Sequence, residues 1–232
     1  MVSVTTNPSL NIDRIDPCQL LKEPVSCLTH AIACVAAVFA SPALLIHAAG
    51  HMAGQGKLIS LAIFMLSMIL LYGASATYHA VWFEGEAGMV FKRIDHMMIF
   101  VLIAGSYTPV CICALGSTGK YMLTTVWILA FAGMIFKLFW VTCPKWLSSV
   151  MYISIGWIVV FALPQLITNV NLTCFSWLLA GGIMYTIGGV IYALKLIKFN
   201  SRNSLWGSHE IFHLFVMAGS LCHYISMFYL FT

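Results

Sequence analysis

Seven apolar runs, each long enough to cross a lipid bilayer, occupy nearly the whole of this 232-residue chain. A spanning helix needs roughly 20 apolar residues, and the runs cover about 25–49, 58–83, 90–115, 121–141, 147–168, 174–197 and 208–231. Charged residues make up only 8% of the chain. In a soluble domain about a quarter of the residues are charged, because they cover its surface. The sequence therefore predicts an all-α integral membrane protein with seven transmembrane helices, joined by connections too short for a separate soluble domain.

The charges in the loops predict how the spans are oriented. Cytoplasmic loops carry an excess of Lys and Arg, and an odd number of spans puts the termini on opposite sides. The side with the N-terminus and the loops after the second, fourth and sixth spans holds Arg14, Lys22, Lys92, Arg93, Lys137, Lys145, Lys195, Lys198 and Arg202. The other side holds only Lys57 and Lys120. We therefore expect residues 1–24 to form a cytoplasmic N-terminal segment, residues 25–232 to form the transmembrane domain, and the C-terminus to lie outside.

Three other features narrow the class of protein. Residues 1–24 are polar and lack the early apolar core of a signal peptide, so we expect the first span to stay uncleaved. Cysteines such as Cys27, Cys34 and Cys222 lie within apolar runs, where thiols pack as small hydrophobes, and no disulfide framework is expected. The net charge of +4 comes from basic residues spread over short loops, so no nucleic-acid partner is expected.

Four ionisable residues inside the predicted spans fall at one depth. Such residues are costly in lipid and usually face the interior of a helix bundle, where they serve a function. His79 lies near the end of the second span, which runs inward, and Asp95 lies near the start of the third, which runs outward. His209 and His213 lie in the first turns of the seventh span, which also runs outward. All four are therefore expected close to the cytoplasmic face.

The spacing of these residues is typical of a catalytic zinc site. His209 and His213 are four residues apart and share a helix face, as do Ser75 and His79. Three imidazoles leave zinc one open position for a water molecule, whose pKa the ion lowers to about 7. Asp95 would then act as the general base and Ser75 would hydrogen-bond nearby. The alternative is a metal-free polar network that holds the helices together.

Residues 209–213, with the sequence HEIFH, also match the H-E-x-x-H motif of zinc peptidases. In that interpretation Glu210 would be the general base and the chain would be an intramembrane protease. The motif has only three fixed positions, and a carboxylate near a helix start can simply complement the helix dipole. Asp95 is therefore the preferred base.

The same residues resemble the progestin and adipoQ receptor family, in particular its bacterial hemolysin III branch. Residues 75–79 (SATYH) are similar to the S-x-x-x-H motif of that family, and residues 93–96 (RIDH) followed by 104–109 (AGSYTP) are similar to its second motif. The pair His209-x-x-x-His213, with His223 ten residues further on, is similar to the third.

The first motif of the family, before the first span, is matched more loosely. Glu23-Pro24 and Thr29-His30 fit it, but Ala31 stands where glycine is usual and the usual asparagine is not evident. The departure weakens the case for a role of Glu23.

The resemblance implies a seven-helix fold in which His79, His209 and His213 hold zinc, Asp95 touches a zinc-bound water and Ser75 lies close by. The wider superfamily includes alkaline ceramidases. The resemblance therefore implies hydrolysis of an amide or ester in a membrane lipid, and a role in lipid homeostasis in a bacterial plasma membrane. Two alternatives stay open: a receptor-like sensor with structural zinc, and a pore-forming hemolysin or channel.

Other polar and small residues receive structural interpretations. His30 lies at the depth of the site and is a candidate support for it. His96 directly follows Asp95 in a helix and is expected to point elsewhere. His223 lies about 15 Å along its helix from His213, too far to bind the same ion, and is expected to join helices. Close packing of the sixth span is expected at Gly181, Gly182, Gly188 and Gly189.

Overall fold

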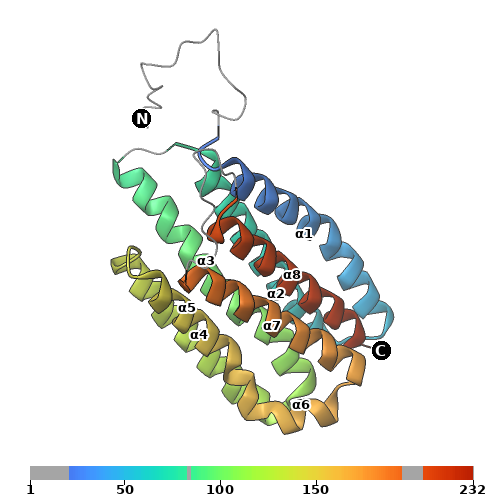
Figure 1. The fold of residues 1–232 in the computed structure, drawn as a ribbon. Coiled ribbons are helices and arrows are strands. Elements are labelled where there is room, and N and C mark those ends of the chain that lie inside the picture. The colour runs from blue at the N-terminus through green and yellow to red at the C-terminus, as the bar shows by residue number, and fades with distance from the viewer. Residues whose placement is uncertain (1–20, 83–84, 195–205, 232) are drawn as a thin grey trace.

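The computed structural model describes residues 21–82, 85–194 and 206–231, which are helical apart from short turns. Six single helices and one composite span in these ranges are long and apolar enough to cross a membrane, which confirms the predicted fold class (Figure 1). The single helices are α1 (Pro24–Gly50), α2 (Gln55–Ala80), α3 (Gly85–Ala114), α4 (Gly116–Phe139), α7 (Leu172–Leu194) and α8 (Ser208–Tyr229). The composite span consists of α5 (Lys145–Gly156), the 3₁₀ helix η3 (Trp157–Ala162) and α6 (Leu163–Asn169).

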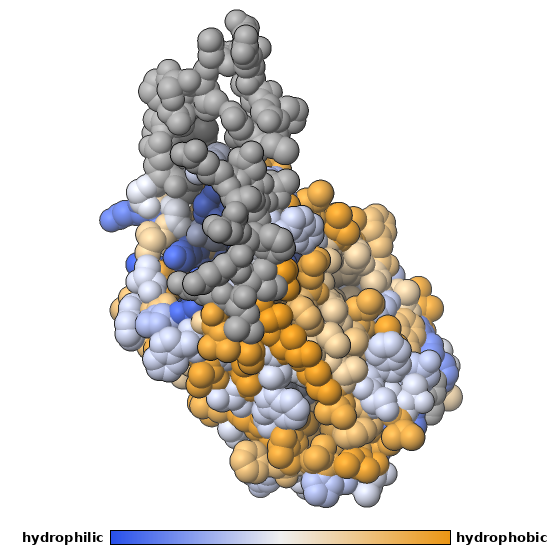
Figure 2. Space-filling view, in the orientation of Figure 1, coloured by the Kyte–Doolittle hydropathy of each residue, from blue (hydrophilic) through white to orange (hydrophobic). Residues whose placement is uncertain are grey.

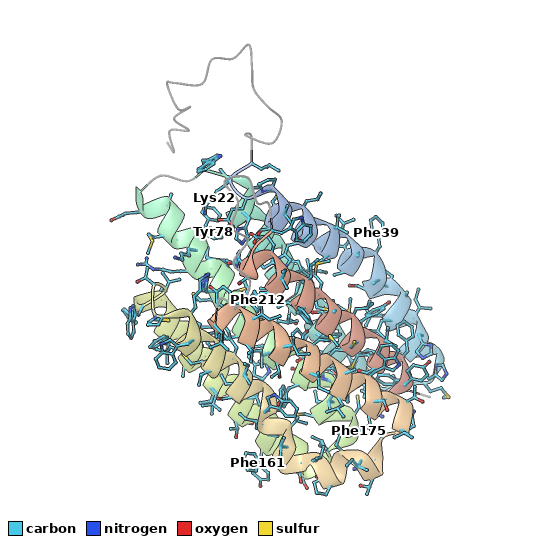
Figure 3. The ribbon with its side chains drawn as sticks, in the orientation of Figure 1. Lys22, Phe39, Tyr78, Phe161, Phe175 and Phe212 are labelled. Atoms are coloured by element: carbon cyan, nitrogen blue, oxygen red, sulfur yellow. The ribbon has the colours of Figure 1, made fainter. Side chains whose placement is uncertain are left out.

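Helices that follow one another in the chain pack side by side, and α8 packs against both α7 and α1, so the spans close into a bundle (Figure 1). At one end of this bundle, called the site end below, α1, α3 and α8 begin and α2 ends. Phe64 and Phe100 are fully buried inside the bundle, whereas Phe39 and Phe161 point outward (Figure 3). The outer surface is largely hydrophobic over the face drawn in Figure 2, as contact with lipid requires.

The composite span changes its helix type in mid-course, and a tyrosine from α3 compensates for the change. A polar backbone group without a partner is costly inside a membrane. The Tyr107 hydroxyl donates to the carbonyl of Gly156 at 2.7 Å and accepts from the N–H of Val159 at 2.9 Å. Pro164, in the first turn of α6, has no N–H to leave unpaired. The change of helix type is therefore stabilised by a tertiary contact that the apolar pattern could not reveal.

Several expectations about the ends of the chain and its orientation are left as predictions. Most of the predicted cytoplasmic segment 1–24 lies outside the described residues, as do Arg14, Lys195, Lys198 and Arg202. The charge difference between the two sets of loops still predicts which side faces the cytoplasm.

Glycines in α7 allow close contact with neighbouring helices at three of the four expected positions. A Cβ at Gly181 would clash with the His223 ring and lie 3.0 Å from the Gly219 carbonyl oxygen. Gly188 faces α8, and Gly189 faces α5. The expectation for Gly182 is wrong, because no atom of a neighbouring helix lies within 4 Å of the position that its Cβ would take.

We expect Gly181→Ala to lower the free energy of unfolding by about 1–3 kcal/mol, because the added methyl group overpacks the α7–α8 contact. The adjacent Gly182→Ala is the matched control. It should change stability by no more than about 1 kcal/mol, in the stabilising direction, because alanine favours a helix and the space is open. Thermal unfolding in detergent measures both. Equal destabilisation by the two variants would contradict the α7–α8 packing.

Candidate metal centre

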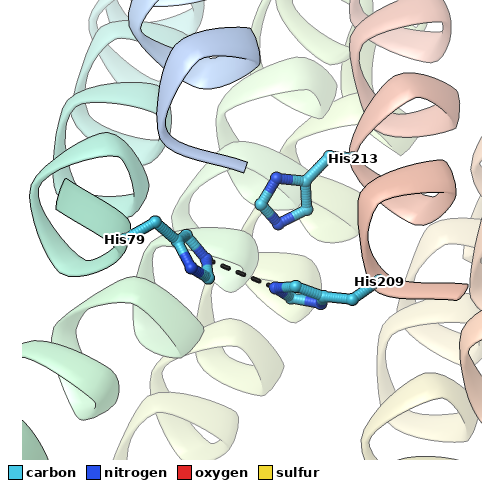
Figure 4. Close-up of side chains that lie close together, drawn as sticks. All are labelled: His79, His209 and His213. Atoms are coloured by element: carbon cyan, nitrogen blue, oxygen red, sulfur yellow. Dashed lines mark hydrogen bonds between the residues drawn. The ribbon is translucent and has the colours of Figure 1, made fainter. Parts of the chain in front are cut away.

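Three histidines from two helices meet at the site end of the bundle (Figure 4). His79 is the last residue but one of α2, and His209 and His213 lie in the first two turns of α8. One ring nitrogen of each lies within 4.8 Å of the other two. His79 and His213 are almost completely buried. The spacing of four residues along α8 brings both of its rings to the face that meets α2.

The separation of one pair of ring nitrogens, from His79 and His209, fits a tetrahedral metal ion. The Nε2 atoms of His79 and His209 are 3.3 Å apart. Two nitrogens bound to zinc at about 2.0–2.1 Å, with a tetrahedral angle between them, lie about 3.3–3.4 Å apart. The described residues offer no hydrogen-bond partner to the Nδ1 atoms of His209 and His213. The three imidazoles could therefore hold an ion through one nitrogen each.

Glu23, the residue before α1, is the member of the site that the sequence supported least. Its Oε2 lies 2.8 Å from Nδ1 of His79. The backbone fixes this contact, because the N–H of Glu23 donates to the His79 carbonyl at 3.0 Å and that of Lys22 to the Ala80 carbonyl at 3.3 Å. Lys22 also lies over the Tyr78 ring, as Figure 3 shows. The hydrogen bond with His79 holds the pKa of the Glu23 carboxyl below its usual value.

A carboxylate on Nδ1 selects the tautomer of a histidine. It keeps the proton on Nδ1 and leaves Nε2 as the metal ligand, an arrangement common around bound metals. Nε2 of His79 is the atom that faces His209. The position of Glu23 just before the first span, on the same predicted side as His79, was the signal that could have found it.

Asp95 and Ser75 lie beside the histidines at the site end of the bundle. Asp95, on α3, is buried and lies near both Ser75 and His79. Ser75 is one turn before His79 on α2, and its buried hydroxyl lacks a hydrogen-bond partner in the part of the chain that is described. The expectation that His96 points away from Asp95 is wrong. Its Nδ1 lies 2.9 Å from the Lys92 carbonyl, one turn back along α3, and 3.5 Å from Oδ2 of Asp95.

Glu210 takes part in the start of α8 instead. Its Oε2 accepts the N–H of Gly207 at 2.8 Å, which caps the helix, and its Oε1 accepts the hydroxyl of Ser26 at 3.1 Å. Both oxygens therefore have structural partners. This arrangement favours Asp95 over Glu210 as the base beside the histidines.

His30 supports the cluster from α1. Its ring lies flat against that of His213, with centroids 3.8 Å apart and planes 7° apart. The Tyr72 ring meets the other side of His30 edge-on at 5.1 Å. Stacking between these rings restricts how the His213 imidazole can turn. His223, by contrast, hydrogen-bonds to the Leu178 carbonyl on α7 and joins two helices, as expected.

Comparison with known proteins identifies the family of this chain. The sequence profile of the family described as "Haemolysin-III related" matches residues 18–224. The chain belongs to this family. It is 35% identical to hemolysin-3 of Bacillus cereus over 204 residues, 87% of this chain and 89% of that protein. A hemolysin-3 homolog of Bacillus subtilis (strain 168) is also 35% identical, over 200 residues that cover 86% and 89% of the two chains.

A more distant relative lies outside the bacteria. The monocyte to macrophage differentiation factor of Homo sapiens is 28% identical over 207 residues, 87% of this chain and 81% of that one. The predicted family is confirmed, and with it the prediction of a multi-pass cell-membrane protein.

This haemolysin-III-related protein also contains an apolar cavity in the same bundle, and the residues that line it do not include His79, His209, His213 or Asp95. The cavity has a volume of about 280 Å³ and lies between α3, the composite span, α7 and α8. Phe212, labelled in Figure 3, lines it, and the centroid of the same ring lies 6.1 Å from that of His213. The hydrophobic pattern could not predict the cavity, because the sequence of an apolar helix face is the same whether that face packs against a side chain or lines an empty space.

Proposed function

We propose that this haemolysin-III-related protein is a zinc-dependent hydrolase that cleaves an amide or ester bond in a membrane lipid. The observation that carries the proposal is the convergence of one ring nitrogen each from His79, His209 and His213 within 4.8 Å, beside the buried carboxylate of Asp95. Nitrogen ligands in a tetrahedral arrangement favour zinc, and three of them leave a fourth position open, as in catalytic zinc sites.

Each residue around the ion would have a separate role in hydrolysis. His79, His209 and His213 would hold the zinc, which supplies a Lewis acid and a water of lowered pKa. Asp95 would accept the proton of the attacking water and return it to the leaving group. Ser75 would donate its unused hydroxyl to the substrate or to Asp95.

The cavity supports a lipid as the substrate. Its lining is almost entirely apolar, with residues such as Leu71, Ile103, Val160 and Leu179, and Phe212 is part of it. Pockets of this kind bind the apolar part of a ligand and leave its reactive part to a few polar groups. An acyl chain in the cavity would bring its carbonyl group past Phe212 toward the histidines. A role in membrane lipid homeostasis would follow from such an activity.

Turnover of a defined lipid panel tests the proposal. The zinc-loaded chain in liposomes should release fatty acid from at least one class of lipid amide or ester, as measured by mass spectrometry. A chelator should stop the release and added zinc should restore it. Zinc-loaded protein that turns over no lipid in the panel would overturn the hydrolase. It would favour the receptor-like sensor with structural zinc, whereas zinc-independent ion flux through the liposomes would favour the pore.

A further inference from the structure

A second polar cluster lies inside the bundle and contains none of the three histidines. It joins the end of α4 to the start of α5 and consists of Lys137, Cys143 and Ser148. The Nζ of Lys137 donates to Oγ of Ser148 at 2.6 Å and to Sγ of Cys143 at 3.1 Å. Sγ and the Ser148 hydroxyl are 3.3 Å apart. All three side chains are buried, and the lysine is 0% exposed.

The partners of Lys137 set its chemistry. A buried ammonium ion is costly without a negative partner. The ion pairs in the described part of the chain do not include Lys137, and its other neighbours are the faces of Phe136 and Tyr152 at about 6 Å. Of the two groups to which Nζ donates, only the thiol of Cys143 can readily become an anion. Lys137 and Cys143 therefore form an amine–thiol pair that can share one proton.

We propose that Lys137 and Cys143 are a modification site, at which hydrogen peroxide joins Nζ to Sγ in a covalent sulfenamide bond. The contact distance of 3.1 Å brings the two atoms together before any reaction. Sulfenic acids condense with nearby nitrogen atoms in this way. Peroxide is small and uncharged, so it can reach a thiol that is only 7% exposed. The argument for this site uses neither the zinc centre nor the proposed hydrolysis.

The reaction balances in two steps from the ammonium–thiolate form of the pair. The thiolate attacks one peroxide oxygen, the O–O bond breaks, and the Lys137 ammonium gives its proton to the departing hydroxide. The products are Cys143 sulfenic acid, a neutral amine and water. The amine nitrogen then attacks the sulfur, the S–O bond breaks, and a second water leaves. Sulfur is oxidised, peroxide is reduced, and the protein loses two hydrogens.

The new bond would tie α4 to the turn before α5. α5 contributes Ser149, Tyr152 and Ile153 to the apolar cavity, and Tyr152 also faces Lys137. A covalent link at this turn would fix the wall of the cavity relative to α4. Oxidation could in this way alter what the cavity admits, without touching the histidines.

Trypsin cleavage provides a direct test on the full-length protein in detergent. Trypsin cuts after Lys137 only when its amine is free. After peroxide, blocking of remaining thiols and unfolding, the peptide 138–145 should disappear. A peptide 121–145, uncut at Lys137 and lighter by two hydrogens, should replace it. Reduction with dithiothreitol before digestion should restore cleavage.

Two variants and one native cysteine complete the test. Lys137→Arg keeps the charge but lacks a nucleophilic amine, so Cys143 should stop at sulfenic or higher acids, and Cys143→Ser should keep cleavage at residue 137. Cys27, a half-exposed cysteine of α1, should be oxidised without forming a link. The proposal is overturned if peroxide oxidises Cys143 of the folded wild-type protein, or leaves it unchanged, while cleavage after Lys137 stays complete.

Discussion

His79→Ala is expected to purify without metal, whereas the wild-type protein should carry about one zinc ion per chain. The variant removes one of three nitrogens that converge within 4.8 Å. The two ligands that remain, both on α8, do not complete a catalytic zinc site. His213→Ala should behave in the same way. Mass spectrometry of the metal in detergent-purified protein measures the ratio.

The control for this experiment is another buried histidine of α8. His223→Gln removes an imidazole that binds the Leu178 carbonyl rather than the cluster, so the variant should keep its zinc. Glu23→Gln should also bind zinc, but with an affinity about 10–100-fold lower. The substitution replaces the carboxylate that orients His79 with a neutral amide, which is a weaker hydrogen-bond acceptor. Competition with a chelator measures that difference.

Wild-type protein that contains no metal after careful purification would contradict the zinc site. The histidines would then be a polar network that holds α2, α8 and α1 together. The hydrolase would have to be withdrawn with the zinc, because the proposed reaction depends on the ion to polarise the carbonyl group and to lower the pKa of the attacking water.

The sequence predicts the fold well because lipid leaves the backbone few options. Unpaired backbone groups are so costly in a membrane that a long apolar run must be a helix. The seven runs accordingly correspond to seven spans, with ends that differ by a few residues, as at Ala80 where residue 83 was expected. The 3₁₀ segment from Trp157 was not predicted, since it depends on the hydroxyl of Tyr107 from another helix.

The site was predictable to the extent that helix direction alone determines depth. His79, His209 and His213 could be placed together because each lies near one end of a span whose direction the alternation of the spans predicts. Contacts that depend on side-chain conformation were not predictable. The His96 ring approaches Asp95, and Lys137, which lies near the end of the fourth apolar run and was counted with the loop charges, is buried.

Asp95→Asn is expected to retain zinc and to lower kcat for lipid hydrolysis by about 10²–10⁴-fold, the usual contribution of general acid–base catalysis. Asparagine has nearly the same shape and does not remove a histidine ligand, so folding and metal content should stay close to wild type. The loss would follow from the missing proton acceptor. Initial rates of fatty acid release, together with the zinc content of the same sample, measure both quantities.

Two neighbouring variants decide whether Asp95 is the base. Ser75→Ala removes the hydroxyl that is proposed to donate to the substrate or to Asp95, and it should slow turnover by about tenfold. Glu210→Gln can still accept the N–H of Gly207 and so preserve the start of α8, and its turnover should stay close to wild type. If Glu210→Gln abolishes hydrolysis while Asp95→Asn does not, the H-E-x-x-H interpretation replaces the present one. The proton acceptor would then lie on α8 with two of the ligands, and the start of that helix would have to rearrange to free the Glu210 carboxylate.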